Sequence, residues 1–144
     1  MRARRLTGAA GLLGALLVLV LVLAARRARL EPMLVQGESM LPTLRPGQRI
    51  AVGPLRGPPA RGDLVVVRAP QSKLEVVKRV VGLPGERVRL AGGFQVTLGP
   101  DEYLVLGDNR AASTDGRAFG PVTTAAMVGR VRFAYWPPRV RLQA

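Results

Sequence analysis

The stretch Leu74-Glu75-Val76-Val77-Lys78-Arg79-Val80-Val81 is the clearest β-strand signal in the sequence. Alternate residues of a strand share one face, and Lys78 is then the only polar residue on its face. The opposite face carries Glu75 and Arg79, and Lys73 continues it just before the run. The alternation therefore predicts that Lys78 points into apolar surroundings, whereas Lys73 and Arg79 lie on a partly solvated surface.

Short β-branched runs between Gly- and Pro-rich turns fill the rest of the chain after residue 30. The further candidate strands are residues 48–52, 63–68, 86–90, 94–98, 102–106 and 127–136. No stretch after residue 30 keeps a 3.6-residue apolar repeat. Many short strands with frequent turn signals predict an all-β barrel or sandwich.

An apolar segment precedes these strands. Residues 8–25 are eighteen uncharged, mostly aliphatic residues with three arginines on each side. A helix of that length spans about 27 Å, close to a hydrocarbon core of about 30 Å. A cleaved secretory signal is the alternative, but its apolar core is usually shorter. We predict a tail at 1–7, a membrane anchor at 8–25, a linker at 26–30 and a β domain at 31–144.

The orientation of that anchor follows from its flanks. The arginine counts tie, but the free amine strengthens the leading flank and Glu31 weakens the trailing one. Long domains also translocate largely regardless of charge. We expect a single-pass protein of the cytoplasmic membrane, with a cytoplasmic N-terminus and the β domain outside the cytoplasm.

The formal net charge of +13 raises nucleic acid as a partner. The arginines after residue 30 are scattered singly and few aromatics accompany them, which argues against nucleic-acid binding. Attraction of a tethered basic domain to anionic membrane lipids is the simpler interpretation.

The residue types that are missing restrict the chemistry. The chain has no His and no Cys, so a Ser-His-Asp triad, a thiol nucleophile and a Cys/His zinc site are excluded. Serine catalysis would need a lysine or carboxylate base, and Lys73 and Lys78 are the only lysines. Burial lowers a lysine pKa enough to supply a neutral base. The alternative for Lys78 is a strand lysine that extends its amine into water.

Ser39 is the candidate nucleophile, within residues 37–44. Serine before a Pro-Thr turn is more commonly a cap or turn former. Gly37 permits unusual dihedrals two residues earlier, and an exposed main-chain N–H near Ser39 could stabilise an oxyanion.

Residues 107–122 form a polar segment unlike an ordinary loop. We expect paired Asp–Arg contacts to make it rigid, and Ser113 is the candidate for orienting a catalytic group. The charged residues of this segment are Asp108, Arg110, Asp115 and Arg117.

Four motifs together resemble the bacterial type I signal peptidases, membrane-anchored Ser/Lys proteases that remove signal peptides. The motifs are GESMLPTL, RGDLVVV, VVKRVVGLPGE and GDNRAASTDGRAFGPV, in family order within residues 37–122. The resemblance implies a mostly antiparallel β fold and preprotein substrates with small residues at −1 and −3. Membrane lipids and the export machinery are further expected partners, and no cofactor or metal is expected.

The resemblance also assigns roles to residues. It implies that Ser39 is the acyl-forming nucleophile, Lys78 the general base and Ser113 the serine that hydrogen-bonds the lysine. Gly37 stands where one branch of the family has a serine, so the Ser39 N–H carries more of the oxyanion stabilisation. Met40 and the four charged residues of the 107–122 segment match supporting positions.

Two rival functions stay open. A self-cleaving repressor of the LexA type shares the dyad, but it would need a DNA-binding segment in place of residues 8–25. A non-catalytic membrane-anchored β module is the other rival, and the presence of both Ser39 and Lys78 argues against it.

Overall fold

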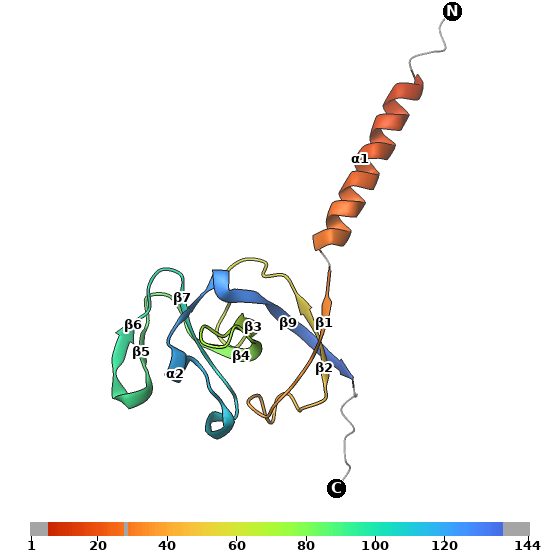
Figure 1. Ribbon diagram of the computed structural model, residues 1–144. Helices are drawn as coiled ribbons and strands as arrows, with labels where there is room; N and C mark the ends of the chain where they lie inside the picture. The colour runs from red at the N-terminus through yellow and green to blue at the C-terminus, as the bar shows by residue number, and fades with distance from the viewer. Residues whose placement is uncertain (1–5, 28, 137–144) are drawn as a thin grey trace, which may run out of the picture.

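The computed structural model describes residues 6–27 and 29–136. One N-terminal helix projects away from a β domain (Figure 1). Most of the tail expected at 1–7, and residues 137–144 of the expected β domain, lie outside the described residues. The elements are α1 (Leu6–Arg27), β1 (Glu31–Leu34), β2 (Arg49–Gly53), β3 (Leu64–Arg68), β4 (Glu75–Gly82), β5 (Arg87–Arg89), β6 (Gln95–Thr97), β7 (Glu102–Leu106), α2 (Gly116–Phe119), β8 (Val122–Thr123) and β9 (Met127–Trp136).

The strands form a seven-stranded sheet in the order β1-β2-β9-β3-β4-β7-β8 and a separate β5-β6 hairpin. Every pairing is antiparallel. The mainly β, antiparallel expectation is therefore confirmed, and each candidate strand is present within two residues of its expected bounds. The sequence patterns missed β1, β8 and α2, which have two to four residues each and are too short to show a periodicity.

The β3–β4 hairpin lies in the middle of the domain (Figure 1). Val66 and Val77 pair across it and join a core cluster with Ile50 of β2. Val65 and Val80, which lie on the opposite face, join a second cluster with β7, β8 and β9. Both faces of β4 therefore contribute valines to the core. The face opposite Lys78 is still partly solvated, as expected, because Glu75 is exposed and Arg79 is half-buried.

Register shifts explain how the sheet curls. The pairing of β9 contains register shifts against both β2 and β3, and the pairing of β4 with β7 contains one as well. Such bulges bend a strand and increase its twist. A third cluster of Leu98, Leu104 and Leu106 packs the β5–β6 side of the domain against β7. The Ser39 turn lines a pocket together with residues 74–77 at the start of β4.

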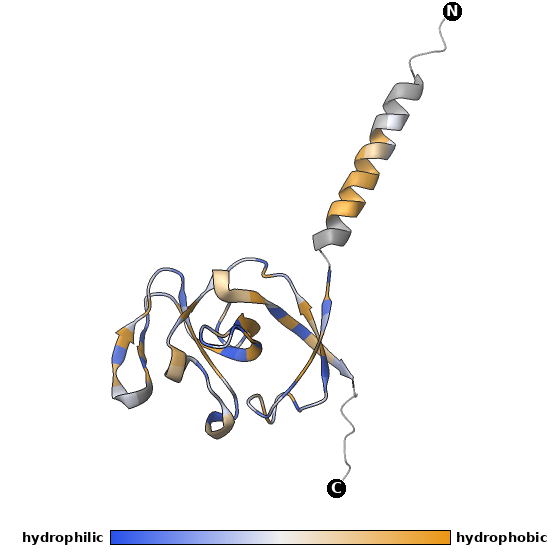
Figure 2. Ribbon diagram, viewed as in Figure 1, coloured by the Kyte–Doolittle hydropathy of each residue, from blue (hydrophilic) through white to orange (hydrophobic). Residues whose placement is uncertain are grey.

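The helix α1 has 22 residues, and Figure 2 shows that its central turns are predominantly apolar. Its described side chains from Leu13 to Leu23 include large apolar groups that are 44–68% exposed. Over the described residues, no helix combines the length and the apolar character required to span a membrane.

Candidate active site

The Ser39 turn connects β1 to β2 and is held from both sides. Gly37 has φ +75, a conformation that costs glycine little and other residues more. Met40, 2% exposed, anchors the turn in the core cluster under β2. From the opposite side, the Asn109 N–H donates to the Ser39 carbonyl at 2.9 Å. The Ser39 side chain is half-buried between these supports.

The Lys78 side chain reaches Ser39 from β4. Lys78 pairs with Val65 of β3 and is 2% exposed, as the alternation predicts. Its Nζ donates to Ser39 Oγ at 3.0 Å. Burial lowers the pKa of the Lys78 amine from its ordinary 10.5, and the negative charge of Asp115 opposes part of that shift. The amine is therefore more easily deprotonated than an exposed lysine and lies within proton-transfer distance of a serine hydroxyl.

Lys73 and Ser72 lie outside the site. Lys73 is exposed, with φ +57, in the turn between β3 and β4. Ser72 lies in the same turn, and its hydroxyl accepts a 3.3 Å hydrogen bond from the Leu74 N–H. Neither side chain lines the pocket beside Ser39. Both are therefore useful controls for substitutions at Ser39 and Lys78.

Arg79, the residue after Lys78, fixes the base of the Ser39 turn. Its guanidinium donates to both carboxylate oxygens of Asp108, at 2.8 and 2.7 Å. The Thr43 hydroxyl donates to the same carboxylate at 2.5 Å. The hydrogen bond from Arg79 lowers the pKa of Asp108. Asp108 was expected to pair within its own loop; instead it pairs with Arg79 of β4. The reason is that β7 pairs with β4 and brings Leu106, two residues before Asp108, opposite Arg79.

Asp115 and Arg117 make the ion pair that the sequence led us to expect. Arg117 Nε donates to Asp115 Oδ1 at 2.9 Å, and the Gly107 N–H donates to Asp115 Oδ2 at 2.9 Å. Burial opposes ionisation of Asp115, but the hydrogen bonds from Arg117 and Gly107 outweigh it and hold its pKa below the ordinary value. Arg110 contributes its carbonyl, which accepts from Arg117 Nη2 at 2.7 Å. These contacts close residues 107–117 into a rigid loop.

Ser113 makes no hydrogen bond to Lys78, which differs from what the resemblance led us to expect. Its hydroxyl oxygen is buried and makes no hydrogen bond of normal geometry to any described residue. It lies close enough to the Asp115 carboxylate to help lower that group's pKa. The hydroxyl also packs against Gly107, where a Cβ would collide with it and, at 2.6 Å, with the Ser39 carbonyl oxygen. Ser113 therefore supports the site through its packing against Gly107.

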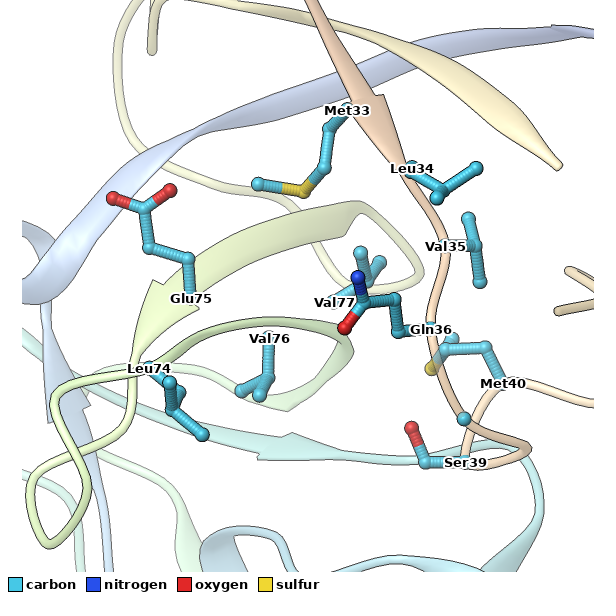
Figure 3. Close-up of a pocket in the computed structure, with 11 residues that line it drawn as sticks. Met33, Leu34, Val35, Gln36, Ser39, Met40, Leu74, Glu75, Val76 and Val77 are labelled. Atoms are coloured by element: carbon cyan, nitrogen blue, oxygen red, sulfur yellow. The ribbon is translucent and has the colours of Figure 1, made fainter. Parts of the chain in front are cut away.

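A pocket of about 440 Å³ opens beside Ser39, between the end of β1 and the start of β4 (Figure 3). Most of its wall is apolar, which suits the body of a peptide more than a charged ligand. The lining residues are Met33, Leu34, Val35, Gln36, Gly37, Ser39, Met40, Leu74, Glu75, Val76 and Val77.

Sequence reasoning missed four parts of this site. Arg79 was assigned only to a partly solvated surface, with no role in the site, and Thr43, Gly107 and Gln36 were not singled out. Gly107 and Thr43 do lie inside the quoted motifs, so the motifs carried a signal for them. Nothing in the strand periodicity could reveal Arg79, because its partner Asp108 lies 29 positions away.

Fold and geometry together define a class of protein. It is an antiparallel β domain that holds a serine hydroxyl against a buried lysine amine, at the edge of an apolar pocket. The family model "Signal peptidase, peptidase S26" matches residues 10–97 and 91–136. The chain belongs to this family and is a serine endopeptidase of the signal peptidase type.

Two relatives agree with the family by sequence. Signal peptidase IB of Staphylococcus aureus is 34% identical over 149 residues, covering 74% of this chain and 78% of the relative. Signal peptidase I of Bacillus caldolyticus is 37% identical over 142 residues, covering 72% of this chain and 78% of the relative. A solved signal peptidase I from Enterococcus faecalis V583 is 26% identical, with a TM-score of 0.48, and the match covers 54% of this chain and 100% of that chain.

Proposed function

We propose that this protein removes N-terminal signal peptides from exported preproteins, after small-x-small sites, with Ser39 and Lys78 as its catalytic dyad. The observation that carries the proposal is the 3.0 Å contact between Lys78 Nζ and Ser39 Oγ, made by a lysine that is 2% exposed. Because burial lowers the pKa of Lys78, the neutral amine that a general base requires is accessible.

The acylation step follows from these positions. Neutral Lys78 takes the Ser39 proton as Oγ attacks the scissile carbonyl carbon, and the carbonyl π electrons move onto oxygen. Among the described residues, the Ser39 N–H has no hydrogen-bond acceptor, so it is available to bind that oxyanion. The protonated lysine then gives its proton to the leaving amine, and the C–N bond breaks.

Deacylation uses the same groups. Lys78, neutral again, takes a proton from water, whose oxygen attacks the ester carbonyl. The C–Oγ bond breaks, Ser39 regains a proton, and the signal peptide leaves with a free carboxylate. No residue other than this pair is required to move a proton.

The walls of the pocket provide the substrate site. β1 is an edge strand, and β4 pairs with β3 over residues 75–79 but with β7 only from Arg79 onward. The two backbone edges that face the pocket are therefore open to an extended peptide, which can add as a strand. The buried floor of Val35, Met40 and Val77 leaves room for small side chains, in keeping with small residues at −1 and −3.

We also propose that residues 8–25 anchor the β domain at a membrane surface, with the N-terminus cytoplasmic. The exposed apolar side chains of α1 support this. β1 follows α1 in the chain, and the outer face of β1, β2 and β9 carries large apolar side chains. Leu34, Phe133 and Trp136 on this face are 51%, 52% and 58% exposed. Leu34, Arg49 and Trp136 are cross-strand neighbours on this face. Aromatic side chains beside an arginine suit the lipid headgroup region.

Ser39→Ala tests the proposed function. In detergent micelles, the wild-type chain should cleave a preprotein after its small-x-small site, and Ser39→Ala should lose at least about a thousandfold in rate because the nucleophile is gone. Ser72→Ala is the matched control and should cleave normally, since Ser72 is exposed and does not line the pocket. Product masses identify the cleaved bond. Cleavage by Ser39→Ala at the wild-type rate would contradict the assignment.

The membrane proposal can be tested with Trp136, the only tryptophan of the chain. In vesicles of anionic lipid, brominated acyl chains should quench its fluorescence, because the β9 face would lie at the headgroups. The double substitution Trp136→Phe with Phe94→Trp moves the reporter to the β5–β6 hairpin, where Phe94 is 72% exposed. That variant should be quenched much less. Equal quenching at both positions would refute the docking of this face.

A further inference from the structure

The pocket beside Ser39 has a floor and a rim of different exposure. Val35, Met40 and Val77 are buried and form an apolar floor. Leu34 and Leu74 are 51% and 65% exposed and lie on the rim. A peptide in the pocket therefore meets two environments, one dry and apolar and the other open to solvent.

Gln36 is the polar side chain of that rim for which the described part of the chain provides no partner. It is exposed, and its carboxamide extends over the pocket toward Val77 (Figure 3). Among the described residues, it makes no hydrogen bond. The other polar side chains of the lining are engaged, Ser39 with Lys78 at 3.0 Å and Glu75 with Arg68 at 3.4 Å.

An extended substrate presents its side chains alternately to these two environments. If the two small residues of a small-x-small site face the floor, the residue between them faces the rim. We propose that Gln36 selects this middle residue by a side-chain hydrogen bond, so that the enzyme prefers a polar side chain with both a donor and an acceptor, such as glutamine. This inference rests on the proposed function and adds a specificity to it.

The chemistry of the carboxamide supports this selection. One carbonyl oxygen and one NH₂ group let Gln36 accept from and donate to the same partner. A substrate methionine of similar size would cover the carboxamide without offering a strong donor or acceptor, and covered polar groups without partners are unfavourable. The discrimination expected from one neutral hydrogen bond is about fivefold in kcat/KM.

The test is a competition between two peptides in one reaction. Both contain the same Ala-x-Ala site, with x as Gln in one and Met in the other, and the full chain cleaves them in detergent micelles. The readout is the ratio of their kcat/KM values, from which any loss of folded enzyme cancels. The variant is Gln36→Met, and the matched control is Gln95→Met, the same exchange at an exposed position of β6.

We expect the Gln-to-Met ratio to fall about fivefold from wild type to Gln36→Met, and to stay at the wild-type value in Gln95→Met. A ratio that Gln36→Met leaves unchanged, or that Gln95→Met changes equally, would overturn the inference while the proposed function stands. Failure of the wild type to cleave either peptide would overturn the proposed function and this inference together.

Discussion

Lys78→Arg should abolish peptide cleavage while the β domain stays folded. Arginine keeps the positive charge but cannot be deprotonated in a protein, so it cannot accept the Ser39 proton. General-base catalysis contributes about a hundred- to ten-thousandfold, and we expect a loss in kcat/KM of at least about a thousandfold. The measurement is preprotein cleavage in micelles, with circular dichroism to verify folding.

Two further variants make this result decisive. Lys73→Arg should cleave normally, because Lys73 is exposed in the β3–β4 turn. Lys78→Met removes the amine without a bulky guanidinium, so inactivity of this variant cannot be attributed to poor fit. Its thermal stability should match or exceed that of wild type, because burying a charged amine is unfavourable. A Lys78→Arg protein with wild-type activity would refute the base assignment.

The pH dependence of the wild type follows from the same group. Because burial lowers the pKa of Lys78, activity should be lost as the pH falls through that lowered pKa and regained as the pH rises through it. The rising limb of kcat/KM should lie below pH 10.5, the ordinary pKa of a lysine amine. The stability of the protein should change in the same direction. At a pH between the lowered and the ordinary pKa, Lys78 binds more protons in the unfolded chain than in the folded one, so its contribution to the free energy of unfolding increases as the pH rises.

Gly107→Ala should disable the site by steric overlap. An added Cβ would meet the Ser113 hydroxyl and, at 2.6 Å, both the Ser113 Cβ and the Ser39 carbonyl oxygen. The backbone cannot easily move away, because the Gly107 N–H donates to the buried Asp115 carboxylate at 2.9 Å. Displacing the Ser39 turn by about 1 Å should lower kcat/KM about a hundredfold. Overpacking should also cost about 1–3 kcal/mol of stability.

Gly99→Ala is the control for this substitution. A Cβ there would meet the end of the Glu102 side chain, at 3.3 Å from its carboxylate oxygen, and that side chain can move. Cleavage rate and melting temperature should therefore change little in Gly99→Ala. If Gly107→Ala kept the wild-type kcat/KM, the packing between residues 107–113 and the Ser39 turn would not matter for catalysis.

Several features of the site could be predicted from sequence because they depend on local pattern or on missing residue types. Alternation over residues 74–81 placed Lys78 in apolar surroundings, and the absence of His and Cys left lysine or a carboxylate as the base. The expectation of a partly solvated opposite face also holds, since Glu75 is exposed and Arg79 is half-buried. Alternation did not reveal that Val77 of that face packs into a core cluster, because the pattern of one strand does not say what covers it.

The sequence by itself determined the strand-rich architecture, the candidate nucleophile and the candidate base. These depend on residue spacing within single segments and on the chemistry that each residue type permits. Only the tertiary structure decided that Lys78 Nζ lies 3.0 Å from Ser39 Oγ, that Arg79 binds Asp108, and that Gln36 extends over the pocket. Those distances depend on how strands far apart in the chain are registered and curled, which no local pattern encodes.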